Sequence, residues 1–358
     1  MIALVWLFIL GAGIGSLLNV CIARLPQEKS VLWPLTSRCG TCYQRIAWYD
    51  NLPLVSYLRL RGRCRTCGAR FSPRYLLVEL GTAVGFVLLF YLEIVQNWYG
   101  IELFRERRYA IRTFDISRIP WEAWAFFLHH AVLLCLLIVA AACDMDRREI
   151  PLSVTIPGTV IGLAGAALFP WPWPNDPSRA LAALPSEESW YPLRFGGKIP
   201  LGLYPWPVWG PLPEGLPPGS WQLGLVTGLM GALFGLFLVR AVRFLCNRGL
   251  GMEALGLGDA DLMMAAGAFL GWQPVLAAFF LGAVAALVMA LPSLFLRGEN
   301  SLPFGPGLAV GIVLAWFWWP SMGPHLQIIL FDKVMLIVVG GLGAVLLFLL
   351  TFLMRRKE

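Results

Sequence analysis

Charged residues and histidines are scarce in this chain. Only 14% of its 358 residues are charged, and the histidines are His129, His130 and His325. The sequence has no H-E-x-x-H motif, which disfavours a membrane metalloprotease, and no G-x-S-x-G motif, which disfavours a serine hydrolase of the nucleophile-elbow type. We expect His129 and His130 to lie in the partly hydrated interior of a membrane span. Aspartate and cysteine therefore remain as the residues to carry chemistry.

Hydrophobic residues make up 58% of the chain, and apolar runs of about 20 residues recur from end to end. This composition predicts an all-α polytopic membrane protein with about eight or nine transmembrane helices in a lipid bilayer. The first run lacks a basic start and a small-residue cleavage site, so we expect it to remain as a helix. The candidate spans are 2–23, 75–96, 122–143, 152–170, 221–246, 259–272, 274–296, 303–320 and 334–354.

Lysine and arginine gather in segment 24–74, which holds ten of them against two acidic residues. The positive-inside rule places this loop in the cytoplasm. The net charge of +7 is then a topology signal and does not indicate a nucleic-acid partner. Segment 101–121 conflicts with the rule, because it carries five arginines and must face outward if every span is real.

The sequence between the spans divides the chain further. Segment 171–220 is rich in proline and tryptophan, which predicts a non-helical extracytoplasmic insertion without a catalytic group. We expect a first transmembrane helix (1–23), a small cytoplasmic zinc-binding loop (24–74), a second helix with an outer loop (75–121), a membrane core (122–320), and an extra hydrophobic segment with a basic tail (321–358).

Two C-x-x-C pairs lie in the cytoplasmic loop, and 21 residues separate them. Four thiolates in two such pairs can surround one tetrahedral Zn²⁺, and four cysteines leave no open position for water, so the zinc would be structural. The alternative is two redox or structural thiol pairs, but disulfides do not persist on the reducing side of the membrane. The predicted ligands are Cys39, Cys42, Cys64 and Cys67.

Two pairs of aspartates stand at the ends of apolar segments, Asp144 with Asp146 and Asp259 with Asp261. Carboxylates at such places are functional candidates, and two of them can act as an aspartic protease pair that shares one proton. Residues two apart on a helix point to nearly opposite faces, so one aspartate of each pair can face a common water. Spacing alone does not say which one. The alternative is a solvated helix end for Asp146 and a helix cap for Asp259.

Several motifs together resemble the prepilin peptidase family, the bacterial type IV leader peptidases. They are Gly11-Ala-Gly-Ile-Gly-Ser-Leu-Leu-Asn19, the two C-x-x-C pairs, Asn51-Leu-Pro-Leu-Val-Ser-Tyr57, Arg74-Tyr-Leu-Leu-Val-Glu79, Glu253-Ala-Leu-Gly-Leu-Gly-Asp259, and Pro303-Phe-Gly-Pro306. The resemblance implies that Asp144, seven residues before Pro151, and Asp259, the aspartate of G-x-G-D, are catalytic. It leaves Glu253, Gly256, Gly258, Asp146 and Asp261 as residues that shape the site.

The resemblance also implies an enzymatic activity, a cellular location and protein substrates. The family cleaves a basic leader after glycine from type IV prepilins or type II secretion pseudopilins, at the cytoplasmic face of the bacterial inner membrane. Many members then methylate the new amino terminus with S-adenosylmethionine. Asp261 stands where the family usually has lysine, which bears on the methyltransferase activity.

Two other classes of function compete with this one. A membrane thiol oxidoreductase would use the C-x-x-C pairs as redox centres, and a non-catalytic assembly scaffold would explain the spans and the zinc. The charge bias disfavours the first, because redox centres of that kind belong on the oxidising side. The second gives no reason for acidic residues at two span ends.

Overall fold

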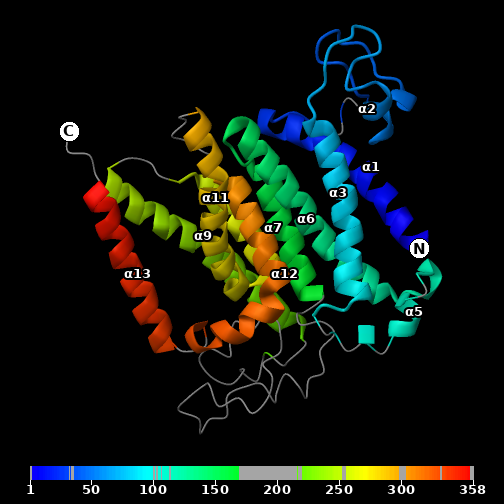
Figure 1. Ribbon diagram of the computed structural model, residues 1–358. Helices are drawn as coiled ribbons and strands as arrows, with labels where there is room; N and C mark the ends of the chain where they lie inside the picture. Colours follow the sequence, from blue (N-terminus) through cyan, green and yellow to red (C-terminus); the bar gives the residue numbers. More distant parts are fainter. Residues whose placement is uncertain are drawn as a thin grey trace. The chain divides into compact units, whose positions relative to one another are not determined.

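The fold was determined as a computed structural model, shown in Figure 1. It describes residues 2–31, 33, 36–99, 101, 104–105, 107–112, 114–168, 216, 220–251, 255–297, 304–330 and 333–354. The described residues form helices, turns and two isolated β-bridges, without a named strand. The predicted all-α fold is therefore confirmed.

Every predicted span coincides with a helix. The helices are α1 (Ile2–Arg24), α3 (Arg74–Phe90), α6 (Trp121–Arg147), α7 (Leu152–Leu168), α9 (Trp221–Leu250), α10 (Leu257–Leu270), α11 (Trp272–Arg297), α12 (Gly305–Leu330) and α13 (Lys333–Met354). Within the described residues, 6 helices are long and apolar enough to cross a membrane. Helix α7 and the first part of α12 are shorter apolar helices, and α10 has only 14 residues. The chain is a multi-pass membrane protein by these criteria.

Contacts divide the chain into two compact units, and the first comprises Met1–Trp98 with Phe104–Arg147. In it, α1 packs along α3 with almost no space between the backbones. A Cβ atom added at Gly11 would lie 2.8 Å from Cα of Ala83, and one added at Gly15 would lie 2.6 Å from Cα of Glu79. Two glycines one turn apart therefore allow the helices to touch, as small-x-x-x-small spacing predicts.

The second unit comprises Tyr99–Leu103 with Arg148–Glu358, and it is also built on glycine contacts. Helix α10 packs against α7 and α9, and α11 packs against α12. A Cβ atom at Gly231 of α9 would lie 2.2 Å from the carbonyl oxygen of Gly267 on α10. Gly311 of α12 makes an equally close approach to Gly282 of α11. The short helix α10, which carries Asp259, is thus fixed by backbone contact.

A buried hydrogen bond joins two helices of the first unit. Helix α3 continues into one π-helical turn, Tyr91–Val95, and this turn places Glu93 against α6. The Nδ1 atom of His130 lies 3.0 Å from Oε2 of Glu93, and both side chains are buried. His130 therefore has a carboxylate partner on the neighbouring helix.

Part of the prediction falls outside the described residues. The insertion 171–220 does so except at residues 216 and 220, and so does Glu253. These assignments remain predictions from the sequence.

Candidate active site and metal centre

The four cysteines of the loop form one cluster. Their sulfur atoms lie within 4.8 Å of one another, and Sγ of Cys39 is 3.8 Å from Sγ of Cys67. Tetrahedral zinc with Zn–S bonds of about 2.3 Å requires sulfur atoms about 3.8 Å apart. A disulfide requires about 2.0 Å. The cluster can therefore hold one metal ion.

The two C-x-x-C pairs have the same backbone conformation. In each, the N–H of the residue after the second cysteine donates to the carbonyl of the first, from Tyr43 to Cys39 and from Gly68 to Cys64. Tyr43 has φ of 56° and Gly68 has φ of 70°, so both turns close through the left-handed region. An isolated β-bridge flanks each pair, at Arg38 with Arg45 and at Arg63 with Arg70.

These turns direct backbone amides at two of the sulfur atoms. Amides of Cys42 and Thr41 lower the pKa of Cys39 to about 6. Amides of Cys67 and Thr66 likewise lower the pKa of Cys64. Hydrogen bonds to the anionic sulfur favour the thiolate, which is the form that binds a metal. The loop is thus prepared for metal ligation by its own backbone.

Asp144 and Asp146 lie in the last turn of α6 and differ in environment. Asp144 is 7% exposed, whereas Asp146 is exposed and forms an ion pair with Arg74 of α3. The helix geometry explains the contrast, because residues two apart point to opposite faces. Asp144 is thus the member of the pair that faces the interior of its unit.

Asp259 and Asp261 show the same contrast in the first turns of α10. Asp259 is 5% exposed, and its Oδ2 accepts a hydrogen bond from the N–H of Gly256 at 3.2 Å. Asp259 thus caps its own helix, as the alternative interpretation predicted. Asp261 is half-buried, and the guanidinium of Arg240 on α9 is near enough to attract its carboxylate electrostatically.

The turn before α10 is held on both sides. Nη1 of Arg243 donates to the carbonyl of Leu255 at 2.7 Å. A Cβ atom at Gly258 would lie 2.9 Å from Cβ of Ile150. A larger residue at Gly258 therefore cannot fit against Ile150 without displacement. The Ile150-Pro151 element and the G-x-G-D turn thus lie in contact within the second unit.

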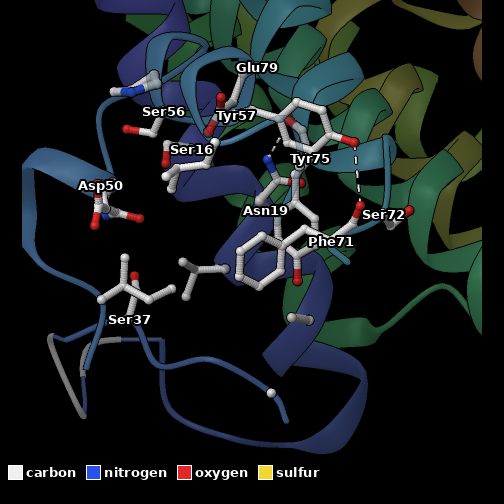
Figure 2. Close-up of a pocket in the computed structure, with 18 of the residues that line it drawn as sticks. Ser16, Asn19, Ser37, Asp50, Ser56, Tyr57, Phe71, Ser72, Tyr75 and Glu79 are labelled. Carbon is white, nitrogen blue, oxygen red and sulfur yellow. Dashed lines mark hydrogen bonds between the residues drawn. The ribbon is translucent and has the colours of Figure 1, made fainter. Parts of the chain in front are cut away.

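A cavity of about 750 Å³ lies in the first unit, between α1, α3 and the cysteine loop (Figure 2). Glu79 of α3 is its buried acidic residue, and Oε2 accepts a hydrogen bond from the N–H of Leu54 at 2.7 Å. Asn19 of α1 donates from Nδ2 to the carbonyl of Tyr75 at 3.0 Å. The other residues labelled around these groups are Ser16, Ser37, Asp50, Ser56, Tyr57, Phe71 and Ser72.

Comparison with known proteins agrees with this geometry. A family model described as the bacterial peptidase A24 N-terminal domain matches residues 9–92, which include α1, the cysteine loop and α3. A second model, described as the type IV leader peptidase family, matches residues 214–291, which include Asp259. A protein of Myxococcus xanthus named prepilin leader peptidase/N-methyltransferase is 30% identical over 319 residues, covering 87% of this chain and 71% of that protein.

The chain belongs to the type IV leader peptidase family. A protein with the same name from Klebsiella pneumoniae is 30% identical, and the match covers 78% of this chain and 91% of that protein. One from Pseudomonas putida is 27% identical, and the match covers 87% of this chain and 88% of that protein. No solved structure matches the chain. The predicted resemblance is confirmed, and the chain is a protease by family.

The matches do not cover all predicted site residues equally. Asp259, Gly256 and Gly258 lie inside the second matched range, whereas Asp144 lies between the two ranges. Asp144 belongs to the first unit and Asp259 to the second. Their joint role remains a prediction.

The sequence alone does not indicate the cavity. Asn19, Tyr75 and Glu79 belong to the motifs that resemble the family, but 56 residues separate Asn19 from its partner Tyr75. The signal in the sequence is a polar residue on each of two apolar helices, Asn19 and Glu79, next to the four-cysteine loop.

Proposed function

We propose that this protein is a prepilin leader peptidase in which Asp144 and Asp259 together activate a water molecule. The observation that carries the proposal is the burial of one aspartate from each pair, at a helix end, in a chain of the leader peptidase family. A carboxylate at a span end is costly to bury, which makes it a functional candidate by default. The relatives named prepilin leader peptidase/N-methyltransferase supply the reaction, which is removal of a leader from prepilins.

In this mechanism the two carboxyl groups hold one proton between them. The ionised group takes a proton from water as general base, while the protonated group donates a hydrogen bond to the scissile carbonyl. The close approach of Gly258 to Ile150 fixes the turn before Asp259 within the second unit. Asp146 and Asp261 lie on other faces and adjust the charge around the pair.

The location and substrate complete the proposal. The positively charged loop and the positive-inside rule support cleavage at the cytoplasmic face of a bacterial inner membrane. The substrates would be type IV prepilins or type II secretion pseudopilins with a basic leader. The metal in the four-cysteine cluster would be zinc with a structural role, because the four thiolates close its coordination sphere. These sulfur distances also favour a metal site over a thiol oxidoreductase.

Four single substitutions test the mechanism. Asparagine keeps the shape of aspartate but cannot cycle a proton, so Asp144→Asn and Asp259→Asn should each abolish cleavage of a prepilin by the purified enzyme. Asp146→Asn and Asp261→Asn are the matched controls and should retain measurable cleavage. Normal cleavage by Asp144→Asn together with an inactive Asp146→Asn would show that the wrong aspartate was chosen. Cleavage by none of the five proteins, wild type included, would support an assembly scaffold instead.

A further inference from the structure

Segment 104–118 carries five arginines, although the orientation proposed above puts it on the side of the membrane where the positive-inside rule expects few. We propose that these arginines form a surface that binds the headgroups of anionic phospholipids such as phosphatidylglycerol. The inference goes beyond the proposed function, because no step of leader cleavage uses this surface.

Two contacts show where the segment lies on the first unit. Arg74 at the start of α3 pairs with Asp146 near the end of α6, and Glu93 after α3 meets His130 in the first half of α6. The two helices therefore run antiparallel, and the segment between them lies at the end of the unit opposite the cysteine loop (Figure 1). At about 1.5 Å per residue, the stretch from Arg74 to Glu93 is about 28 Å long, close to the thickness of a hydrocarbon core. The segment thus lies at headgroup level.

Apolar side chains anchor the segment and leave its arginines exposed. The ring of Phe104 packs edge to face against Phe126 of α6, with the ring centres 5.8 Å apart. Ile111, in the short helix α5 (Arg108–Arg112), is 1% exposed. The arginines lie on the solvent-accessible side of the same segment. They are Arg105, Arg107, Arg108, Arg112 and Arg118.

Three of these arginines have no acidic partner in the described part of the chain. The carboxylate of Asp115 lies 3.3 Å from Arg118 and neutralises that residue. Arg107, Arg108 and Arg112 form no ion pair with any residue that the structure describes. A guanidinium can donate two parallel hydrogen bonds to one phosphate. The three side chains therefore present a positive surface that is complementary to phosphate headgroups.

Two tryptophans favour lipid over an acidic protein as the partner. Trp98 follows the π-helical turn after α3 and is 45% exposed, and Trp121 begins α6 and is 65% exposed. Exposed tryptophan is enriched at the level where headgroups meet acyl chains. The arginines lie between these two residues in the sequence, so the phosphates of the same leaflet are within their reach.

Photochemical labelling of the full-length, zinc-loaded protein in nanodiscs tests the proposal. One set of nanodiscs contains phosphatidylglycerol with a photoreactive headgroup, and the other contains phosphatidylcholine with the same group. The phosphatidylglycerol probe should label residues 104–118 at least about tenfold more than the phosphatidylcholine probe. Equal labelling of this segment by the two lipids would overturn the inference. The readout does not involve cleavage, so such a result leaves the peptidase proposal intact.

Substitution of the three arginines identifies the charge as the cause. The combined variant Arg107→Gln, Arg108→Gln, Arg112→Gln should lose at least about tenfold of the labelling, because each arginine near an anionic surface contributes about fivefold. The corresponding lysine variant keeps the charge and should retain at least half of the labelling. Equal losses in the two variants would show that labelling does not follow charge, and unchanged labelling in the glutamine variant would show that these arginines do not bind lipid. Either result would overturn the inference.

Three exposed arginines of the cysteine loop supply a matched control. Combined substitution of Arg45, Arg59 and Arg61 by glutamine removes the same charge and should leave labelling of residues 104–118 unchanged. An equal loss in this control would show that the probe responds only to net charge, and it would contradict a local site. If neither lipid labels the segment while its arginines are shielded from an arginine-modifying reagent in native membranes, the partner is an acidic protein and the inference is wrong.

Discussion

Two separate glycine-to-alanine substitutions on α1 test quantitatively how closely α1 packs against α3 beside the cavity. A methyl group at Gly15 would lie 2.6 Å from Cα of Glu79, whereas one at Gly13 has no neighbour within 4 Å. Carbon atoms pack best at about 3.5–4.0 Å, so Gly15→Ala must separate α1 from α3 by roughly 1 Å. Overpacking of this kind costs about 1–3 kcal/mol.

Gly13→Ala is the control because it makes the same change in helix propensity two residues away. That change favours folding by about 0.5–1 kcal/mol in both variants and cancels in their difference. Thermal unfolding in detergent should therefore give Gly15→Ala a lower midpoint than Gly13→Ala by several degrees.

The result that refutes this reasoning is a pair of equal midpoints. It would mean that α1 and α3 are not in backbone contact at Gly15.

Further measurements test the other parts of the protein. Metal analysis should find about one zinc per chain, and Cys64→Ser should lose it; a metal-free, folded and active wild type would contradict the site. Asp146→Asn should lower stability by about 1 kcal/mol or less, since its ion pair with Arg74 is partly exposed, and a larger loss in urea unfolding would show that the pair is essential to the fold. Replacement of segment 171–220 by a short polar linker should preserve cleavage, and loss of cleavage with normal insertion would show that the segment contributes to the site.

The fold could be predicted from the sequence wherever hydropathy and spacing act locally. Apolar runs indicate the spans because lipid satisfies no backbone polar group. The C-x-x-C spacing indicates the metal cluster because the geometry of each turn is contained in a few residues. The spacing of Gly11 and Gly15 indicates that this helix packs closely on another, but it does not say which one.

Contacts between distant residues could not be predicted in this way. Glu93 meets His130 across 37 residues, and this depends on the π-helical turn at Tyr91–Val95, which no local pattern indicates. The burial of Asp144 rather than Asp146 depends on which face of α6 packs inward, and a helix hydrophobic on most sides does not show this face in its sequence. Family motifs, not spacing, singled out Asp144.

The position of the two cysteine pairs has a consequence for how this protein matures. A metal ion bound by both pairs closes residues 43–63 into a ring, and the ring contains Leu54, Ser56 and Tyr57 of the cavity lining or its hydrogen bonds. The opposite wall, with Asn19 and Glu79, belongs to helices that form on membrane insertion. One wall of the cavity thus depends on metal supply and the other on the bilayer. Protein produced without that metal should therefore insert in the membrane but lack the ordered loop wall of this cavity.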